Sequence, residues 1–179
     1  MRLQAWKLRV ATGALILGGL AVPALGLTHA GANTDPCAGG GPGVFQGSGA
    51  DDVMVTGNGN DKICSYGGND IVRSRGGADF VDSGWGNDLV NAGGGGDTVH
   101  ASNGNDTVNS GGGSDWITGG AGNDDISAGA GPDTVDGGFG SDNIDAGSDQ
   151  ASDNIDGGNG IDNCTGTGGN DTVTDCNAP

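Results

Sequence analysis

The sequence has no glutamate and few basic residues. Only six lysines and arginines stand against 23 aspartates in 179 residues, and three of those six lie within the first nine positions. Beyond residue 30, only Lys62, Arg73 and Arg75 remain, which leaves a net charge of −20. Such a chain repels phosphates, which excludes a nucleic-acid-binding protein. No long apolar run follows residue 27, so no membrane span is expected there.

Catalytic groupings are also missing. The two histidines, His29 and His100, have no cysteine or serine partner at catalytic spacing. The glycine run at 93–96 lacks the Gly-Lys-Ser/Thr that follows in a phosphate-binding loop. A repeat fills most of the chain and leaves no stretch long enough for a catalytic domain. We therefore predict that the protein is not an enzyme.

Aspartate recurs every nine residues through the middle of the chain. In this block each aspartate follows a glycine by two residues and precedes a valine or isoleucine by two. The ten aspartates of the block are Asp61, Asp70, Asp79, Asp88, Asp97, Asp106, Asp115, Asp124, Asp133 and Asp142. Small slips add units at Asp51, Asp153, Asp162 and Asp171, which makes 14. A period of this length indicates a solenoid.

Each unit, x-G-x-G-x-D-x-V/I-x, combines a tight turn with a very short strand. Glycine permits positive φ, so the chain can reverse sharply. Strand alternation then points the valine or isoleucine inward and its two neighbours outward. Two units make one coil, and stacked coils make two parallel sheets. We predict an all-β fold, a parallel β-roll that is a two-sheet right-handed solenoid of about seven coils.

The turns of this roll need a stabilising partner. One aliphatic residue per nine cannot offset the ordering cost of the unit by burial at about 25 cal/mol per Å². Alternate aspartates face the same side, about 5 Å apart, and would repel each other. Calcium prefers six to eight oxygen ligands from carboxylates and carbonyls and would reverse that repulsion. Cysteine and histidine, which favour zinc, do not follow the period.

The unit resembles the haemolysin-type (RTX) calcium-binding nonapeptide repeat, G-G-x-G-x-D-x-U-x. Residues 119–127 and 137–145 match it fully. The resemblance implies a β-roll in which Ca²⁺ ions lie between same-side turns, bound by the position-6 aspartate and backbone carbonyls. The implied metal ligands are Asp51, Asp61, Asp70, Asp79, Asp88, Asp97, Asp106, Asp115, Asp124, Asp133, Asp142, Asp162 and Asp171.

Two features depart from the family pattern. Position 1 is mostly not glycine, and residues 148–153 contain two inserted residues with Ala151 at position 4. Asp153 is therefore left out of the implied ligands. Composition alone, with 42 glycines and 4% aromatics, is typical of a disordered chain. A disordered chain has no reason to keep a valine or isoleucine in phase with each aspartate. We therefore expect disorder only in the calcium-free state.

The first 30 residues have the features of a secretory signal peptide. Basic residues precede an apolar run at 11–27, and Thr28-His29-Ala30 resembles a signal-peptidase site, with cleavage after Gly26 as an alternative. The predicted organisation is a signal peptide at 1–30, an amino-terminal cap segment at 31–45, a β-roll of 14 repeats at 46–174 and a tail at 175–179. The protein is expected to be secreted.

Four cysteines remain after the signal peptide, and secretion favours disulfides. Coil spacing separates Cys64 from Cys164 by roughly 26 Å, whereas a disulfide needs Cα atoms within about 7 Å. A bridge between Cys37 and Cys164 would detach one end of the rod. The spacing therefore predicts one bridge at each end, Cys37 to Cys64 and Cys164 to Cys176.

These observations predict a small secreted calcium-binding repeat protein. The alternative is an extracellular adhesive or cell-envelope protein in which calcium is only structural. Outward apolar residues at position 7 (Ile71, Phe80, Leu89 and Trp116) could serve a partner, but the sequence identifies no protein or cell-wall partner. An ice-binding solenoid would need a Thr-x-Thr array, and only residues 172–174 have that form.

Overall fold

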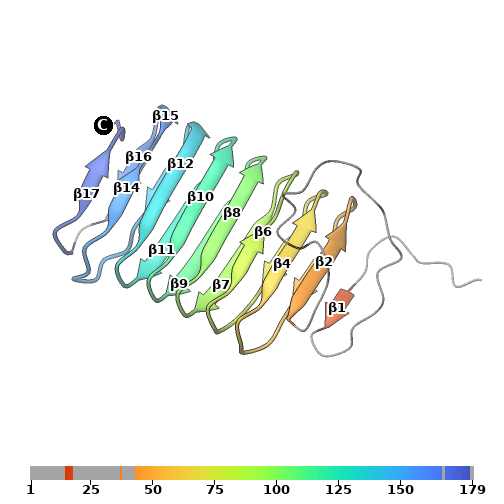
Figure 1. Ribbon diagram of the computed structural model, residues 1–179. Coiled ribbons are helices and arrows are strands. Elements are labelled where there is room, and N and C mark those ends of the chain that lie inside the picture. The colour runs from red at the N-terminus through yellow and green to blue at the C-terminus, as the bar shows by residue number, and fades with distance from the viewer. Residues whose placement is uncertain (1–14, 18–36, 38–42, 167, 178–179) are drawn as a thin grey trace, which may run out of the picture.

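The computed structural model describes residues 15–17, 37, 43–166 and 168–177. The predicted signal peptide lies outside these residues except for one strand, and so does most of the predicted cap segment. Among the described residues no helix is long and apolar enough to cross a membrane. The described residues form stacked coils of strand, with β2 near one end and β17 at the other (Figure 1).

Two parallel sheets make up the structure. Sheet A contains, in spatial order, β1 (Leu15–Leu17), β3 (Val53–Val55), β5 (Ile71–Arg73), β7 (Leu89–Gly94), β9 (Thr107–Gly112), β11 (Asp125–Ala130), β13 (Asn143–Asp145) and β16 (Asn163–Thr165). Sheet B contains β17 (Thr172–Thr174), β14 (Asn154–Asp156), β12 (Thr134–Gly140), β10 (Trp116–Ala121), β8 (Thr98–Asn103), β6 (Phe80–Asp82), β4 (Lys62–Tyr66) and β2 (Val44–Ser48), while β15 (Asn159–Gly160) pairs with β12.

The register of both sheets follows the sequence period. Val90 pairs with Val108, and Ile126 pairs with Ile144, so neighbouring strands of one sheet are 18 residues apart in the regular block and 20 apart across the insertion. From β2 to β14, consecutive strands alternate between the sheets because each repeat unit crosses the roll once. This arrangement confirms the predicted parallel β-roll of about seven coils.

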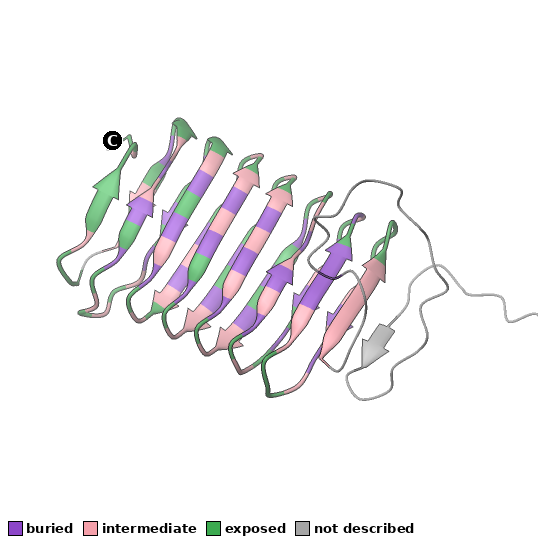
Figure 2. Ribbon diagram, in the orientation of Figure 1, coloured by how far each residue is buried: buried purple, intermediate pink, exposed green. Residues whose placement is uncertain are grey.

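The core lies between the sheets and has two inward positions per unit. Position 8 supplies buried aliphatic side chains such as Val90, and position 1 supplies buried small ones such as Ala92. In Figure 2 the buried residues alternate along the middle strands. The sequence predicted strands of three residues and one inward position. The middle strands are longer, up to seven residues, so the second inward position was missed.

Position-4 glycines let the turns stack closely. Gly113 has a φ of +144°, and a Cβ there would overlap the carbonyl oxygen of Gly95 one coil away. Only glycine meets both conditions without strain. The same contact recurs at Gly95 and Gly131. Glycine at position 4 is therefore required both by the positive φ and by the close packing of adjacent coils.

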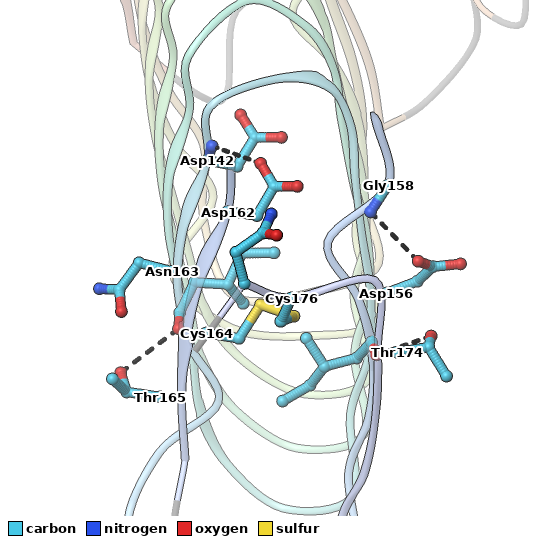
Figure 3. Close-up of a disulfide and its surroundings, with 12 residues drawn as sticks. Asp142, Asp156, Gly158, Asp162, Asn163, Cys164, Thr165, Thr174 and Cys176 are labelled. Carbon is cyan, nitrogen blue, oxygen red and sulfur yellow. Dashed lines mark hydrogen bonds between the residues drawn. A yellow bond between two sulfur atoms is a disulfide. The ribbon is translucent and has the colours of Figure 1, made fainter. Parts of the chain in front are cut away.

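Both ends carry the disulfides predicted from the repeat spacing. Cys37 is bonded to Cys64 with a Cα separation of 6.1 Å, and Cys164 to Cys176 with 5.8 Å. Figure 3 shows the second bridge, drawn below Asp142 and Asp162. The backbone N–H of Asn177 donates to the Asp162 carbonyl at 2.9 Å. The residues after β17 are thus bonded to the sheet A side of the last coil.

Candidate metal site in two aspartate columns

The repeat aspartates form two columns, one where the turns enter sheet A and one where they enter sheet B. Within a column, Oδ1 of each aspartate accepts the backbone N–H of the aspartate one coil earlier, at 2.7–3.1 Å. Column A contains Asp52, Asp70, Asp88, Asp106, Asp124, Asp142 and Asp162. Column B contains Asp61, Asp79, Asp97, Asp115, Asp133, Asp153 and Asp171. The alternation predicted for the unbroken block is confirmed.

The first unit departs from its predicted register by one residue. Asp52 is buried and its N–H donates to Asp70, whereas Asp51 is exposed. Met54 accordingly fills the core position that Val53 was expected to fill. The prediction that Asp51 is the position-6 residue is wrong, because a nine-residue step back from Asp61 reaches Asp52.

Asp153 belongs to column B in spite of the insertion before it. Its Oδ1 accepts the N–H of Asp133 at 2.9 Å, across 20 residues instead of 18. The longer turn is held by Asp149, whose carboxylate accepts the N–H groups of Gly131 and Ala151. The inserted residues therefore leave the aspartate in place, a result that the sequence did not predict.

The second carboxylate oxygen of most column aspartates is buried without a hydrogen-bond partner. This holds for Oδ2 of Asp70, Asp79, Asp88, Asp97, Asp106, Asp115, Asp124, Asp133, Asp142 and Asp162. Burying an unpaired charged oxygen costs far more than burying a paired one. Figure 3 shows the carboxylates of Asp142 and Asp162, one coil apart, drawn within the same turn region. A row of such oxygens requires protons or cations.

Burial raises the pKa of several column carboxylates. The pKa of Asp106 rises to about 7, because burial disfavours its charge and the carboxylates of Asp124 and Asp88 add to the effect, although the Asp88 N–H opposes it. The same cause raises the pKa of Asp97 and Asp133 to about 6. Without a cation, these three carboxylates thus keep their protons to a higher pH than a free aspartate does.

The chemistry of the turns suits a hard cation. Beside the unpaired Oδ2 of Asp124, a Cβ at Gly119 would lie 2.6 Å away, and beside Asp142 one at Gly137 would lie 2.8 Å away. Glycine therefore keeps space open next to the orphaned oxygen. Among the described residues, no three His, Cys, Asp or Glu side chains converge as a metal cluster. Backbone carbonyls would have to complete an oxygen shell, which calcium accepts.

A second row of polar side chains lies beside column A. The side-chain Oδ1 atoms of Asp51, Asn69, Asn87, Asn105 and Asn123 each accept the N–H of the equivalent residue one coil later, at 2.7–2.8 Å. On the column B side, Asn60 is the one described residue that makes the same contact, to Ala78. Sequence reasoning missed this ladder, although asparagine at every second unit was its signal.

The family comparison agrees with this geometry. A family model for the RTX calcium-binding nonapeptide repeat, four copies long, matches residues 38–72, 65–99, 91–126, 100–135 and 118–151. These segments together span 38–151, more than half of the chain. No match was found among curated proteins or among solved structures. The chain, with its glycine turns and aspartate columns, belongs to the RTX calcium-binding repeat family.

Proposed function

We propose that this calcium-binding repeat protein is secreted and that calcium, entering between successive same-side turns, drives the folding of the rod. The proposed ligands are the column aspartates other than Asp153, together with backbone carbonyls of the glycine turns. They are Asp61, Asp70, Asp79, Asp88, Asp97, Asp106, Asp115, Asp124, Asp133, Asp142, Asp162 and Asp171, with Asp52 in place of Asp51. Several ions would be bound, each shared by two neighbouring coils.

The observation that carries this proposal is the row of unpaired Oδ2 atoms. Each column aspartate already uses Oδ1 to bind the adjacent coil. A cation at Oδ2 would neutralise two carboxylates at once and remove the cost of burying them. Without it, neighbouring carboxylates repel, and the ordering cost of a glycine-rich chain is not met.

Secretion is supported by the cysteines and by the sequence of the first 30 residues. The described chain has no free cysteine, and paired cysteines are typical of oxidising compartments. The calcium affinity expected of an extracellular module, about 10⁻⁴–10⁻³ M, also suits that location. We propose a binding role without catalysis, since the sequence offers no nucleophile and base at catalytic spacing.

Calcium titration of the disulfide-intact protein, followed by circular dichroism, tests the proposal. We expect low β-content in excess chelator and a cooperative rise with a midpoint of about 10⁻⁴–10⁻³ M calcium. Magnesium should be a poor substitute, because it retains its waters and requires octahedral geometry. Equal β-content in chelator and in calcium would contradict calcium-driven folding.

Exposed aromatic side chains favour a second candidate, an adhesive or cell-envelope role. Trp85, Trp116 and Phe139 are 66%, 58% and 67% exposed, and such rings often anchor partners. The position-7 residues named from the sequence do not form one stripe, because Ile71 lies on sheet A and Phe80 on sheet B. Retention on cell-wall material, lost in a Trp85→Ala, Trp116→Ala variant, would support this role.

A further inference from the structure

The residues at position 1 of the repeat differ between the two halves of the rod. Position 1 lies five residues before the column aspartate and points into the core. It carries hydroxyl side chains in four consecutive units, at Thr56, Ser65, Ser74 and Ser83; alanine follows at 92 and 101, and one more hydroxyl at Ser110. From residue 119 onward it carries only glycine or alanine. All five hydroxyl residues are buried.

Each of these hydroxyls binds the next coil directly. The acceptor is the backbone carbonyl of the position-1 residue 18 positions later. The bonds run from Thr56 to Ser74 (3.2 Å), Ser65 to Ser83 (2.8 Å), Ser74 to Ala92 (3.0 Å), Ser83 to Ala101 (2.9 Å) and Ser110 to Ala128 (2.5 Å). A buried hydrogen bond of this kind stabilises the contact between adjacent coils, and none of them needs a cation.

The hydroxyls also stand beside the aspartate columns. Burial raises the pKa of Asp70 to about 6, and the nearby Ser65 hydroxyl partly opposes that rise. Ser83 acts in the same way on Asp88. The Oδ2 atoms stay without a partner because the single hydroxyl proton is used on the carbonyl. In these coils a side chain occupies the space that Gly119 and Gly137 leave open further along.

The charge distribution strengthens the difference. Residues 101–179 contain fourteen aspartates and no lysine or arginine. Lys62, Arg73 and Arg75 all lie in the amino-terminal half, as does the disulfide from Cys37 to Cys64. Repulsion between aspartates is therefore least where the hydroxyl ladder is present and greatest where it is absent.

We propose that the hydroxyl-lined coils at 56–101 stay ordered without calcium and form the template on which calcium assembles the glycine- and alanine-lined coils. This inference rests on the proposed function, since it assigns the calcium requirement to one half of the rod. In a solenoid each coil contacts only its neighbours, so an ordered segment can propagate along the rod. The position-1 side chain thus decides which turns depend on the ion.

Hydrogen exchange of the full, disulfide-intact chain, read by mass spectrometry, tests this. In chelator, peptides within 56–101 should exchange slowly and peptides within 119–160 at the rate of an unfolded chain. Saturating calcium should protect both. If the whole chain exchanges at the unfolded rate in chelator and is protected everywhere in calcium, the inference is overturned but the proposed function stands. Equal protection in chelator and calcium contradicts the proposed function instead.

Two sets of variants assign the effect to the hydroxyls. Ser65→Ala with Ser83→Ala should speed exchange of 56–101 in chelator by about tenfold, because two buried carbonyls lose their donors. Protection in calcium should persist. The control is Ser114→Ala with Ser141→Ala, at two exposed positions, and should change nothing. If the two double variants exchange at the same rate in chelator, the inference is overturned.

A variant that adds a hydroxyl tests the same idea without relying on a loss of order, which misfolding alone could also cause. Ala128→Ser places a donor where the carbonyl of Ala146 is the equivalent acceptor one coil later. In chelator this variant should extend slow exchange into the coil that contains residue 128. If exchange in that coil is unchanged while the variant keeps the wild-type fold in calcium, the hydroxyl ladder is not what keeps the coils ordered without calcium.

Discussion

The regular middle of the rod, residues 89–140, and its carboxyl-terminal end, residues 143–177, are built from the same unit but differ in pairing. Strands β7 to β11 are six residues long, whereas β13, β14, β16 and β17 have three or fewer paired residues each. At the end, Cys164 takes the place of an aliphatic core residue and Val173 is 48% exposed. The aspartate ladder nevertheless continues through both regions.

The two-residue insertion explains much of this difference. It lengthens the links from Asp133 to Asp153 and from Asp142 to Asp162 to 20 residues, yet both bonds stay at 2.9 Å. The short strand around the inward side chain is kept, since Ile144 pairs with Cys164. The second paired segment is lost from β13, and after β14 it remains only as the two-residue β15, which pairs with β12. The column and the inward side chain are thus the fixed parts of the unit, and the rest of the turn is adjustable.

The largest effect is expected from a clash in the middle. Gly113→Ala puts a Cβ into the carbonyl of Gly95 at a φ of +144°, which should cost more than about 3 kcal/mol. Gly169→Ala makes a similar overlap with the Ala151 carbonyl, but in the last coil. Urea unfolding in calcium should show global loss for the first and loss of the end coil alone for the second.

An open turn provides the control for this pair. Nothing lies within 4 Å of a Cβ added at Gly57, so Gly57→Ala should unfold near the wild-type urea concentration. If Gly113→Ala and Gly169→Ala destabilise the whole rod equally, the end is not separable from the middle.

A large pH effect is expected in the calcium-free protein. Burial raises the pKa of Asp106 to about 7 and that of Asp124 to about 6, above the value near 3.9 of an unfolded chain. The folded state therefore binds more protons. Stability from these groups is fully present below about pH 4 and is lost as the pH rises through about 6 to 7.

Circular dichroism in chelator should show more β-structure at pH 4.5 than at pH 7.5. In calcium the trend should reverse, because protons compete with the ion for the same oxygens. Asp106→Asn should weaken both trends. A calcium-free chain that gains order as the pH rises would contradict the burial of these carboxylates.

A moderate and local effect is expected from the carboxyl-terminal disulfide. Closing so short a loop contributes roughly 3 kcal/mol on the loop-entropy estimate. Cys164→Ser with Cys176→Ser should therefore expose 154–174 to hydrogen exchange and leave 80–130 protected. The matched variant, Cys37→Ser with Cys64→Ser, should loosen only the opposite end. Equal loss of protection along the rod in either variant would mean that the bridges act globally.

The smallest expected effect is a difference in the calcium midpoint of folding between variants at Asp106 and Asp153. Asp106→Asn keeps an Oδ1 acceptor for the Asp88 N–H but removes a charge shared with two neighbours. It should raise the calcium midpoint of folding several-fold, by about 1 kcal/mol. Asp153, in the altered turn and 5% exposed, should shift the midpoint less when changed to asparagine. A larger shift at Asp153 would show that the inserted turn is the stronger site.

The sequence predicted the features that depend on strict periodicity. Asp61 to Asp142 lie in the two expected columns, and the cysteines pair as coil spacing requires. Errors arose where composition varied. Met54 fits the core because its flexible side chain fills irregular space, but it does not match the Val/Ile pattern, and Asp51 was chosen instead of Asp52.

The second inward position was missed for a different reason. A serine such as Ser65 usually indicates a surface or turn position, yet here a carbonyl one coil away satisfies its hydroxyl. That acceptor exists only after the coils stack. The asparagine row has the same origin, because Asn87 bonds to Asn105, 18 residues away, and not within its own turn.

The two side-chain ladders beside column A run in opposite directions. In the aspartate ladder an earlier coil donates to a later one, as from Asp88 to Asp106, whereas in the asparagine ladder the later coil donates, as from Asn105 to Asn87. The column A edge of the rod is therefore held by two rows of hydrogen bonds between coils. The column B edge, with one such asparagine contact, is held mainly by the aspartate row. Under a pulling force applied along the rod axis, adjacent coils should separate first at the column B edge, so the rod would open like a hinged book and not split cleanly across.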